Sequence, residues 1–328
     1  MAGLSSADLV VRFRRWLLWG LAVGVLLYLA GAIWAGIGEM GEELRRFTWW
    51  LAIPILLLTT ANYGLRFLKW HFFLGRLSIR VPWRDNLLYF VAGLAMVISP
   101  GKAGEVLKPW LVRARTGANL ATSIPALVAE RLTDGIAMLI LAGFGVATYA
   151  GDKVHYVVAP AVVVVLGLAL LANRRASMWI LSLLSCLPGL SRVGHKLEEM
   201  YVATRTCLAP GPLVLAIAIS VVAWWAECVG YWLVFRGFGV AASLDLSTFL
   251  YAFATIAGGA MPGGLGVADG ALGGGAWKLV PEITRAQALA SALLIRIATL
   301  WYGVCLGALA LFRLGSLLVG AGRPEPNH

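Results

Sequence analysis

Long blocks of apolar residues dominate the chain and alternate with short polar segments. The blocks fall at about residues 16–37, 48–68, 87–100, 123–150, 156–173, 212–235, 247–261 and 286–312. Six of them are long enough to cross roughly 30 Å of hydrocarbon as helices, which rise about 1.5 Å per residue. The first block is longer than the apolar core of a signal peptide, which has about 7–15 residues. The pattern predicts an all-α, polytopic membrane protein with six spanning helices.

The two remaining blocks are too short to span. Residues 87–100 and 247–261 would each cover about 21–22 Å as a helix, and they lead into the pairs Pro100-Gly101 and Pro262-Gly263. Proline ends a helix, and glycine permits a tight reversal of the chain. Each block therefore predicts either a half-crossing hairpin or a kinked full crossing.

The distribution of Lys and Arg separates these two topologies, because cytoplasmic loops of membrane proteins are rich in basic residues. With two hairpins and a cytoplasmic N-terminus, the inner loops hold 16 basic residues and the outer loops hold 6. With two full crossings the count is 11 against 11. The inner total includes Lys69, which follows the block at 48–68. The count favours two re-entrant hairpins, with both termini on the cytoplasmic side of the inner (plasma) membrane.

Hairpins that enter from opposite faces are the pattern of an inverted repeat, and weak internal similarity supports one. The matches keep a near-constant offset: Leu77-Ser78-Ile79 with Phe238-Gly239-Val240 (161 residues), Pro100-Gly101 with Pro262-Gly263 (162), and Arg131 with Arg296 (165). We expect a single membrane domain over residues 1–328. Within it, repeat 1 (48–150) and repeat 2 (212–312) are joined by a connecting helix and a basic, amphipathic cytoplasmic segment (151–211).

The composition agrees with this class and excludes several functions. Hydrophobic residues make up 60% of the chain and charged residues 13%, with a mean hydropathy of +0.82, whereas soluble proteins have roughly 45–50% and about 25%. The net charge of +11 is explained by cytoplasmic loops, since the sequence has no groove-reading or base-stacking motif. The four cysteines form no CxxC pair, and the four histidines lack metal-ligand spacing. We expect no metal, no cofactor and no nucleic-acid partner.

Charged residues inside the apolar blocks are the candidates for function. A charge at the bilayer centre costs about 2.5–3.5 kcal/mol on insertion scales, so it needs a partner or a wet cavity. At the first hairpin tip, Gly101 and Lys102 offer backbone N–H groups and a cation suited to an anion such as phosphate. Glu105 can pair with Lys102 or Lys108, or take up a proton. We expect Lys108 to extend to the cytoplasmic headgroups.

The second hairpin offers glycine at its tip and one acid on an otherwise apolar arm. Gly263 and Gly264 permit the close approach of either another helix or a ligand. An acid such as Asp269 is costly on an apolar arm inside the membrane, so it needs a partner or a wet cavity. The hairpin therefore contributes candidates for substrate binding and for a charge network.

The helices that follow the hairpins carry further charges. Glu130, Arg131 and Asp134 lie about 11–17 Å from the cytoplasmic end of their helix, and Arg131 can pair with Asp134 at i, i+3. In the inverted repeat, Arg131 and Arg296 approach the midplane of the membrane from opposite sides. There they either bind substrate or bind the carbonyls and acids of the hairpins.

Two more charges lie on the first helix of each repeat. Glu227 lies near the middle of its block and is interpreted as a proton carrier or as the partner of Arg66. Arg66 lies near the inner end of its block, where the alternative is extension to the headgroups.

Three motifs resemble the lysylphosphatidylglycerol synthase transmembrane family, the flippase-like region of multiple-peptide-resistance-factor proteins. They are Ser99-Pro100-Gly101-Lys102-Ala103-Gly104-Glu105, Glu130-Arg131-Leu132-Thr133-Asp134 and Met261-Pro262-Gly263-Gly264-Leu265-Gly266. The resemblance covers about residues 48–312 and implies lipid translocation. Members are associated with aminoacylated phospholipids, polyprenol- or dolichol-linked sugars and hopanoid pathways. In bifunctional members an aminoacyl-transferase domain follows, and because the chain ends at His328 we expect no synthase activity.

Three hypotheses follow for the function. The first is a flippase or scramblase for an anionic phospholipid, a polyprenyl-phosphate-linked lipid or a related lipid. Its headgroup would lie against Lys102, Arg131 and Arg296, while the carboxylates orient these cations or couple transport to protons. The second is a membrane-embedded lipid-modifying enzyme, which we do not expect because no nucleophile or His-containing acid–base pair is visible. The third is a non-transporting partner of lipid-biosynthesis enzymes. The sequence does not predict the oligomeric state.

Overall fold

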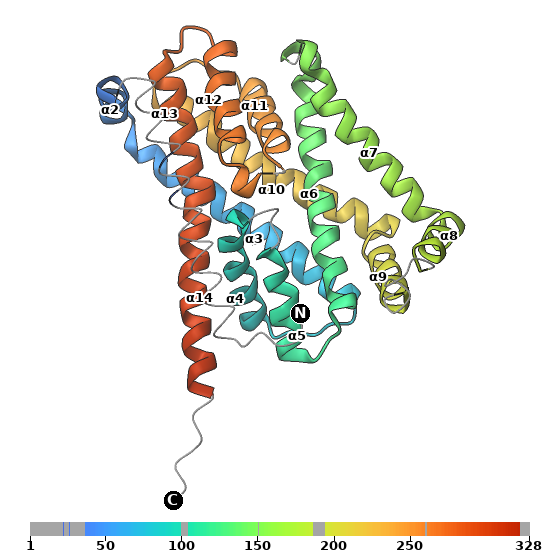
Figure 1. The fold of residues 1–328 in the computed structure, drawn as a ribbon. Coiled ribbons are helices and arrows are strands. Elements are labelled where there is room, and N and C mark those ends of the chain that lie inside the picture. The colour runs from blue at the N-terminus through green and yellow to red at the C-terminus, as the bar shows by residue number, and fades with distance from the viewer. Residues whose placement is uncertain are drawn as a thin grey trace, which may run out of the picture.

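The computed structural model describes residues 22, 26, 37–99, 104–149, 151–185, 194–259 and 261–321. Helices joined by short turns make up this part of the chain, and no strand occurs in it, which confirms the predicted all-α class there (Figure 1). The helices are α2 (Ile37–Arg46), α3 (Ala52–Arg76), α4 (Trp83–Leu94), α5 (Leu107–Thr116), α6 (Leu120–Tyr149), α7 (His155–Ala172), α8 (Arg174–Ser185), α9 (Gly194–Cys207), α10 (Pro210–Gly237), α11 (Leu244–Ala257), α12 (Val267–Leu279), α13 (Arg285–Arg296) and α14 (Tyr302–Ala321).

Four helical stretches in the described part are long and apolar enough to cross a membrane. They are Trp49–Arg76, Leu120–Tyr149, Pro210–Gly237 and Arg285–Leu314, the last running through α13 and α14. They cover the predicted blocks at 48–68, 123–150, 212–235 and 286–312. The block at 156–173 corresponds to α7, whose apolar part, Val157–Leu171, is shorter than these four. The block at 16–37 lies almost entirely outside the described residues.

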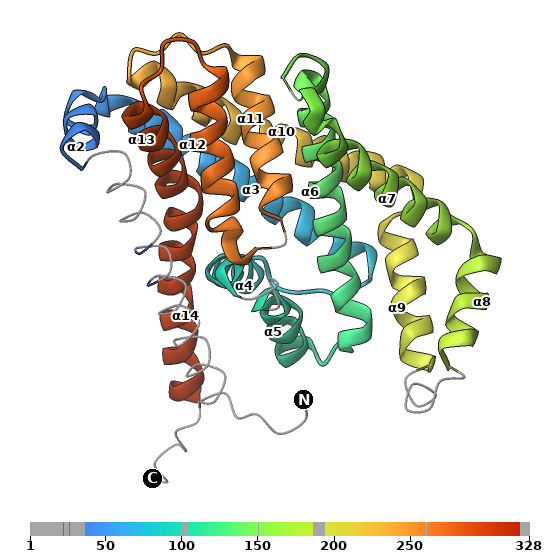
Figure 2. The same ribbon diagram turned by 45° about the horizontal axis from the view of Figure 1, so that its top comes forward.

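Two helical hairpins, α4–α5 and α11–α12, point toward each other from opposite ends of the molecule (Figures 1 and 2). The first arm of one hairpin ends in a 3-10 turn at Ala95–Ile98, and the other reverses through a 3-10 turn at Pro262–Gly264. The two turns contact each other. Ile98 joins an apolar cluster with Leu265, Leu300 and Val304. The end of the first arm of α4–α5 and the turn of α11–α12 therefore meet inside the protein.

The two halves repeat the same local geometry at the offset that the sequence predicts. The ends of α3 and α10 are 161 residues apart, and so are the starts of α4 and α11. After each long helix, a residue with positive φ closes the turn: Ser78 (59°) and Gly239 (72°). The next backbone N–H groups, of Ile79 and Val240, each donate to the carbonyl five residues back, at 2.9 and 3.0 Å. Each half thus consists of a long helix, a hairpin and a second long helix.

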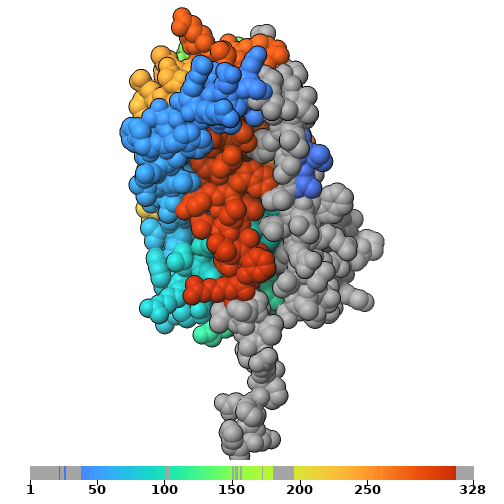
Figure 3. Space-filling view, turned by 90° about the vertical axis from the view of Figure 1, so that its left-hand side faces the viewer, coloured from blue at the N-terminus to red at the C-terminus, as the bar shows by residue number. Residues whose placement is uncertain are grey.

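The outer surface is apolar where long helices face outward. On one side of the molecule α13 and α14 run beside α3 (Figure 3). Several large side chains on these helices are exposed, among them Leu57 (64%), Leu309 (66%) and Phe312 (75%). Apolar surface on this scale is typical of a protein that contacts a membrane or another protein.

Candidate functional site

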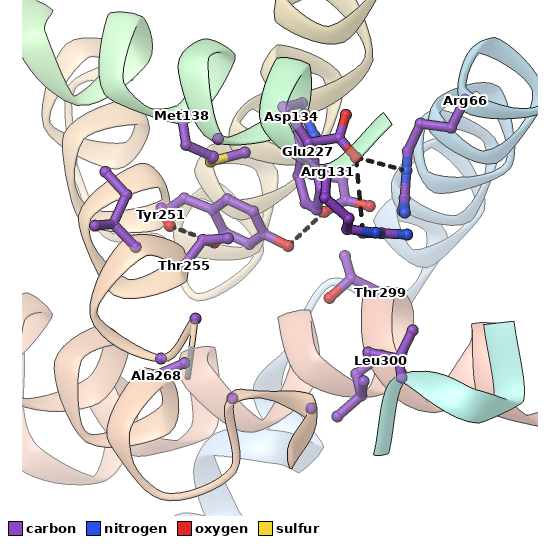
Figure 4. A pocket seen from close by; sticks show the side chains of 18 of the residues that line it. Arg66, Arg131, Asp134, Met138, Glu227, Tyr251, Thr255, Ala268, Thr299 and Leu300 are labelled. Atoms are coloured by element: carbon purple, nitrogen blue, oxygen red, sulfur yellow. Dashed lines mark hydrogen bonds and ion pairs between the residues drawn. The ribbon is translucent and has the colours of Figure 1, made fainter. Parts of the chain in front are cut away.

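A cavity of about 760 Å³ lies where the two hairpins meet α3, α6 and α10 (Figure 4). Its lining comes from both halves of the chain. Glu105 belongs to the first hairpin, and Gly263 and Gly264 belong to the second. Neither half encloses the cavity alone, so residues some 160 positions apart in the sequence share one site.

Charged side chains form part of the lining. Arg131 Nε lies 2.7 Å from Glu105 Oε2, and its terminal nitrogens lie 3.1 Å from Glu130 and 3.7 Å from Asp134. Arg66 lies 3.6 Å from Asp134 and 3.7 Å from Glu130. The Arg131 side chain is 30% exposed, whereas those of its three acidic partners are at most 6% exposed. Arg131 is therefore the cation of this group that is open to a ligand.

Two lysines support this group from behind. Lys69 donates to Asp134 Oδ1 at 2.5 Å, and Lys108 donates to Glu130 Oε2 at 2.5 Å. The Lys108 ammonium also lies 4.5 Å from the centre of the Trp70 ring. Neither lysine is more than 2% exposed. Because removing one member of a buried ion pair leaves an uncompensated charge, the network holds each member in place.

Arg296, the last residue of α13, connects the second hairpin to the cavity. Its Nε donates to Asp269 Oδ1 at 2.9 Å, and its Nη2 donates to the carbonyl of Gly263. Asp269 also accepts the backbone N–H of Gly266 at 2.8 Å, which fixes the start of α12. Gly263 and Gly264 have φ of 58° and 71°, a region that glycine adopts without steric cost. Glycine at the tip thus lets the backbone turn at the cavity wall.

Glu227 on α10 contributes a carboxylate with a different kind of partner. Its Oε2 accepts a hydrogen bond from the Tyr251 hydroxyl at 2.6 Å, and Figure 4 shows the two side chains approaching from α10 and α11. Glu227 is 3% exposed and lines the cavity. No cation of the described residues lies within ion-pair distance of it.

Apolar side chains make up much of the remaining lining. They come mainly from α6 and α7, among them Val128, Leu132, Leu139 and Val164. Figure 4 places Met138 and Arg66 at opposite sides of the pocket. The cavity therefore offers both charged and apolar surface, as an amphipathic ligand requires.

Several polar atoms around the cavity have unused hydrogen-bonding capacity. Six buried side-chain atoms make no hydrogen bond within the described part of the chain, and five belong to cavity-lining residues. Arg66 Nε, Arg131 Nε and Asp134 Oδ2 take part in ion pairs, whereas Glu105 Oε1 and Trp224 Nε1 do not. Leaving such a group unsatisfied costs about 1–3 kcal/mol. These two atoms favour a polar ligand group here. Over the same residues, no set of three or more His, Cys, Asp or Glu side chains is arranged to hold a metal ion.

Comparison with known proteins identifies the family. The model of the lysylphosphatidylglycerol synthase TM region matches residues 17–307. The chain belongs to this family. Two proteins of Methanothermobacter thermautotrophicus, each described as a UPF0104 membrane protein, are similar to it. One is 26% identical over 311 residues (88% of this chain and 90% of the relative), and the other is 24% identical over 279 residues (76% and 82%). No solved structure matches the chain.

The structure brings most of the predicted site residues into one place. The cavity lining includes Arg66, Glu105, Arg131, Asp134, Glu227, Gly263, Gly264 and Arg296. Glu130 lies directly behind it, and Asp269 contacts Arg296. Gly101 and Lys102 lie outside the described residues. The roles assigned to these residues stay predictions.

Three expectations about individual charges in this family member are wrong. Lys69 is not a loop residue, because α3 continues to Arg76 and buries it. Lys108 does not extend to the headgroups but points inward to Glu130. Arg66 is buried, with ion pairs to α6 instead of Glu227. The apolar block at 48–68 ends just before Lys69, whereas the helical hydrogen bonding of α3 continues to Arg76.

Sequence reasoning also missed Tyr251, which supplies the hydrogen bond to Glu227. Nothing in the sequence marks this residue, because tyrosine is ordinary in an apolar helix. Lys69 did leave a signal, since it lies three residues after Arg66 on the same helix face.

Proposed function

We propose that this protein carries a lipid with an anionic headgroup across the inner membrane and does not modify it. The observation that supports the proposal best is the shared cavity. It presents the partly exposed Arg131 beside apolar lining, and its lining residues include two polar atoms without a hydrogen bond or ion pair in the described part of the chain, Glu105 Oε1 and Trp224 Nε1. A headgroup would contact Arg131 and Arg296, while the acyl chains would lie along the apolar lining. Lys102, at the first tip, is proposed as a further contact.

In this proposal the two hairpins are re-entrant and the halves form an inverted repeat. The equal local geometry at an offset of 161 residues and the contact between the two hairpins support both statements. Transporters built from inverted repeats place their sites near the bilayer midplane, where broken helices meet. The excess of Lys and Arg in the loops on one side favours a cytoplasmic position for both termini.

Three carboxylates beside the cavity are held in a way that favours transport over an enzymatic function. Glu105, Glu130 and Asp134 each lie beside at least one cation, an arrangement that positions charges around a ligand. A general acid or base must instead be able to exchange a proton with its substrate. Enzymes of lipid synthesis remain proposed partners, as suppliers or users of the transported lipid.

A reconstitution assay tests the proposal against its two alternatives. Purified protein is placed in liposomes that contain a trace of fluorescent phosphatidylglycerol, and a membrane-impermeant reductant quenches the outer leaflet. We expect the reductant to reach label from both leaflets only in vesicles that contain the protein, and mass spectrometry to find the lipid unchanged. A chemically altered lipid would indicate an enzyme. An unaltered lipid that stays in its leaflet would favour a non-transporting partner.

A further inference from the structure

The carboxylate of Glu227 differs from the other acids around the cavity. Glu105, Glu130, Asp134 and Asp269 all have a Lys or Arg nitrogen within 2.9 Å. Glu227 instead accepts a hydrogen bond from a neutral tyrosine hydroxyl. Its negative charge is therefore not balanced by direct contact with any described cation.

The groups that face Glu227 come from every helix that packs around it. They are Tyr63 and Arg66 on α3, Asp134 on α6, Tyr251 on α11, Arg296 on α13, and Cys228 on its own helix. Arg66 and Arg296 favour the ionised carboxylate, but each already pairs with another acid. Asp134 disfavours it through like-charge repulsion. Tyr251 can donate to either the ionised or the protonated form.

Protonation of Glu227 changes the charge of the cavity by one unit. Among the described residues in and directly behind the lining, five cations (Arg66, Lys69, Lys108, Arg131 and Arg296) accompany five carboxylates (Glu105, Glu130, Asp134, Glu227 and Asp269). Glu227 is the carboxylate of this set that lacks direct contact with one of these cations. Its protonation adds one positive charge to the site. A ligand with one negative charge offsets that addition, and unbalanced buried charge is costly.

We propose that the cavity binds one proton on the Glu227 carboxylate together with one lipid whose phosphodiester headgroup carries a single negative charge. The proposal rests on lipid transport as the function. An O–H bond forms at Glu227 when the cavity faces one aqueous phase and breaks when it faces the other. The proton and the headgroup cross together, so no net charge crosses the membrane and a pH gradient drives the lipid.

The proposal predicts how a lipid distributes under a pH gradient. Liposomes with the purified protein and a trace of fluorescent phosphatidylglycerol receive a gradient of about two pH units, which for one-to-one coupling corresponds to about a hundredfold accumulation. We expect the label to collect in the leaflet that faces the alkaline side. An imposed membrane potential at equal pH leaves the distribution even. Protein-free vesicles report any movement that the protein does not cause.

Variants identify the group that carries the proton. Glu227→Gln keeps an acceptor for Tyr251 but cannot exchange a proton, so its vesicles reach an even distribution under the same gradient. Glu42→Gln makes the same change at a side chain that is 72% exposed, and it accumulates lipid as the wild type does. A pH-sensitive dye inside wild-type vesicles tests the coupling without any amino-acid substitution. Inward lipid movement carries protons inward, so the dye reports a fall in internal pH.

The outcomes separate this inference from the function on which it rests. Wild-type protein that moves lipid but leaves both leaflets equal under the gradient would overturn proton coupling and leave lipid transport intact. Accumulation that persists in Glu227→Gln, or movement driven by membrane potential alone, would also overturn it. Absence of any lipid movement by the wild type would remove both proposals.

Discussion

Replacing Arg131 by alanine is expected to lower the rate of lipid translocation by about ten- to a hundredfold. Hydrogen bonds to charged groups are worth about 1.5–3 kcal/mol, and about 1.4 kcal/mol corresponds to a factor of ten. Arg131 is the cation of its cluster that is exposed to the cavity, with a 30% exposed side chain. The measurement is the reductant assay on purified variants at equal protein density. Arg46→Ala, at a side chain that is 75% exposed, serves as the control and leaves the rate unchanged.

If Arg131 served only to stabilise the fold, its variants would behave differently. Its loss leaves Glu105 without the cation that lies 2.7 Å away, so folding alone would explain a defect in the single variant. The double variant Arg131→Ala/Glu105→Ala removes both charges and is expected to recover thermal stability but not translocation. Arg131→Lys keeps the charge without the planar fork of donors. Its translocation rate is expected to lie between those of the wild type and Arg131→Ala. A double variant that translocates lipid at the wild-type rate would show that Arg131 serves only to neutralise Glu105.

Replacing Glu130 by alanine is expected to lower the free energy of unfolding by about 3–5 kcal/mol, the range for breaking a buried ion pair. Glu130 is fully buried and lies near Lys108, Arg66 and Arg131. Arg66 and Arg131 keep ion pairs with other acids, but Lys108 loses its one ion pair among the described residues. Unfolding by increasing SDS in detergent micelles, followed by tryptophan fluorescence, measures the loss.

Two comparisons decide whether burial causes this effect. Glu42→Ala removes an acid from the exposed pair with Arg46 and is expected to change stability little, since surface pairs are worth about 0–1 kcal/mol. Glu130→Leu/Lys108→Met replaces the buried pair by apolar side chains and is expected to recover most of the loss. Equal stability of Glu130→Ala and Glu42→Ala would contradict the network described for α3, α5 and α6.

The apolar pattern predicts those parts of the fold that depend on length and burial. The blocks at 48–68, 123–150, 212–235 and 286–312 correspond to long helices. In a membrane an apolar segment forms a helix because its backbone N–H and C=O groups then bond to each other. The match of Leu77-Ser78-Ile79 with Phe238-Gly239-Val240 predicts two turns of equal backbone geometry, which the structure contains. Helix ends are less predictable, since α3 runs eight residues past its apolar block.

The sequence predicts which charged residues form the candidate site, but it does not predict which of them form ion pairs with each other. Arg131, Arg296 and Glu227 are visible in the sequence because charges are rare inside apolar blocks. Their partners depend on how helices distant in sequence pack together. Arg131 contacts Glu105 across the first hairpin, and Arg296 contacts the second hairpin through Asp269. The inward direction of Lys108 follows from the position of α5 against α6, which spacing along the chain does not specify.

The opposite orientation of the two hairpins is the central claim, and cysteine labelling tests it most directly. Single cysteines replace Arg115, at the base of the first hairpin, and Glu282, at the base of the second, in a chain without its four native cysteines. Both residues are exposed. With a membrane-impermeant maleimide on intact cells, the account predicts that the cysteine at 282 reacts at once and that the one at 115 reacts only after permeabilisation. Labelling of both from the same side would contradict the inverted arrangement.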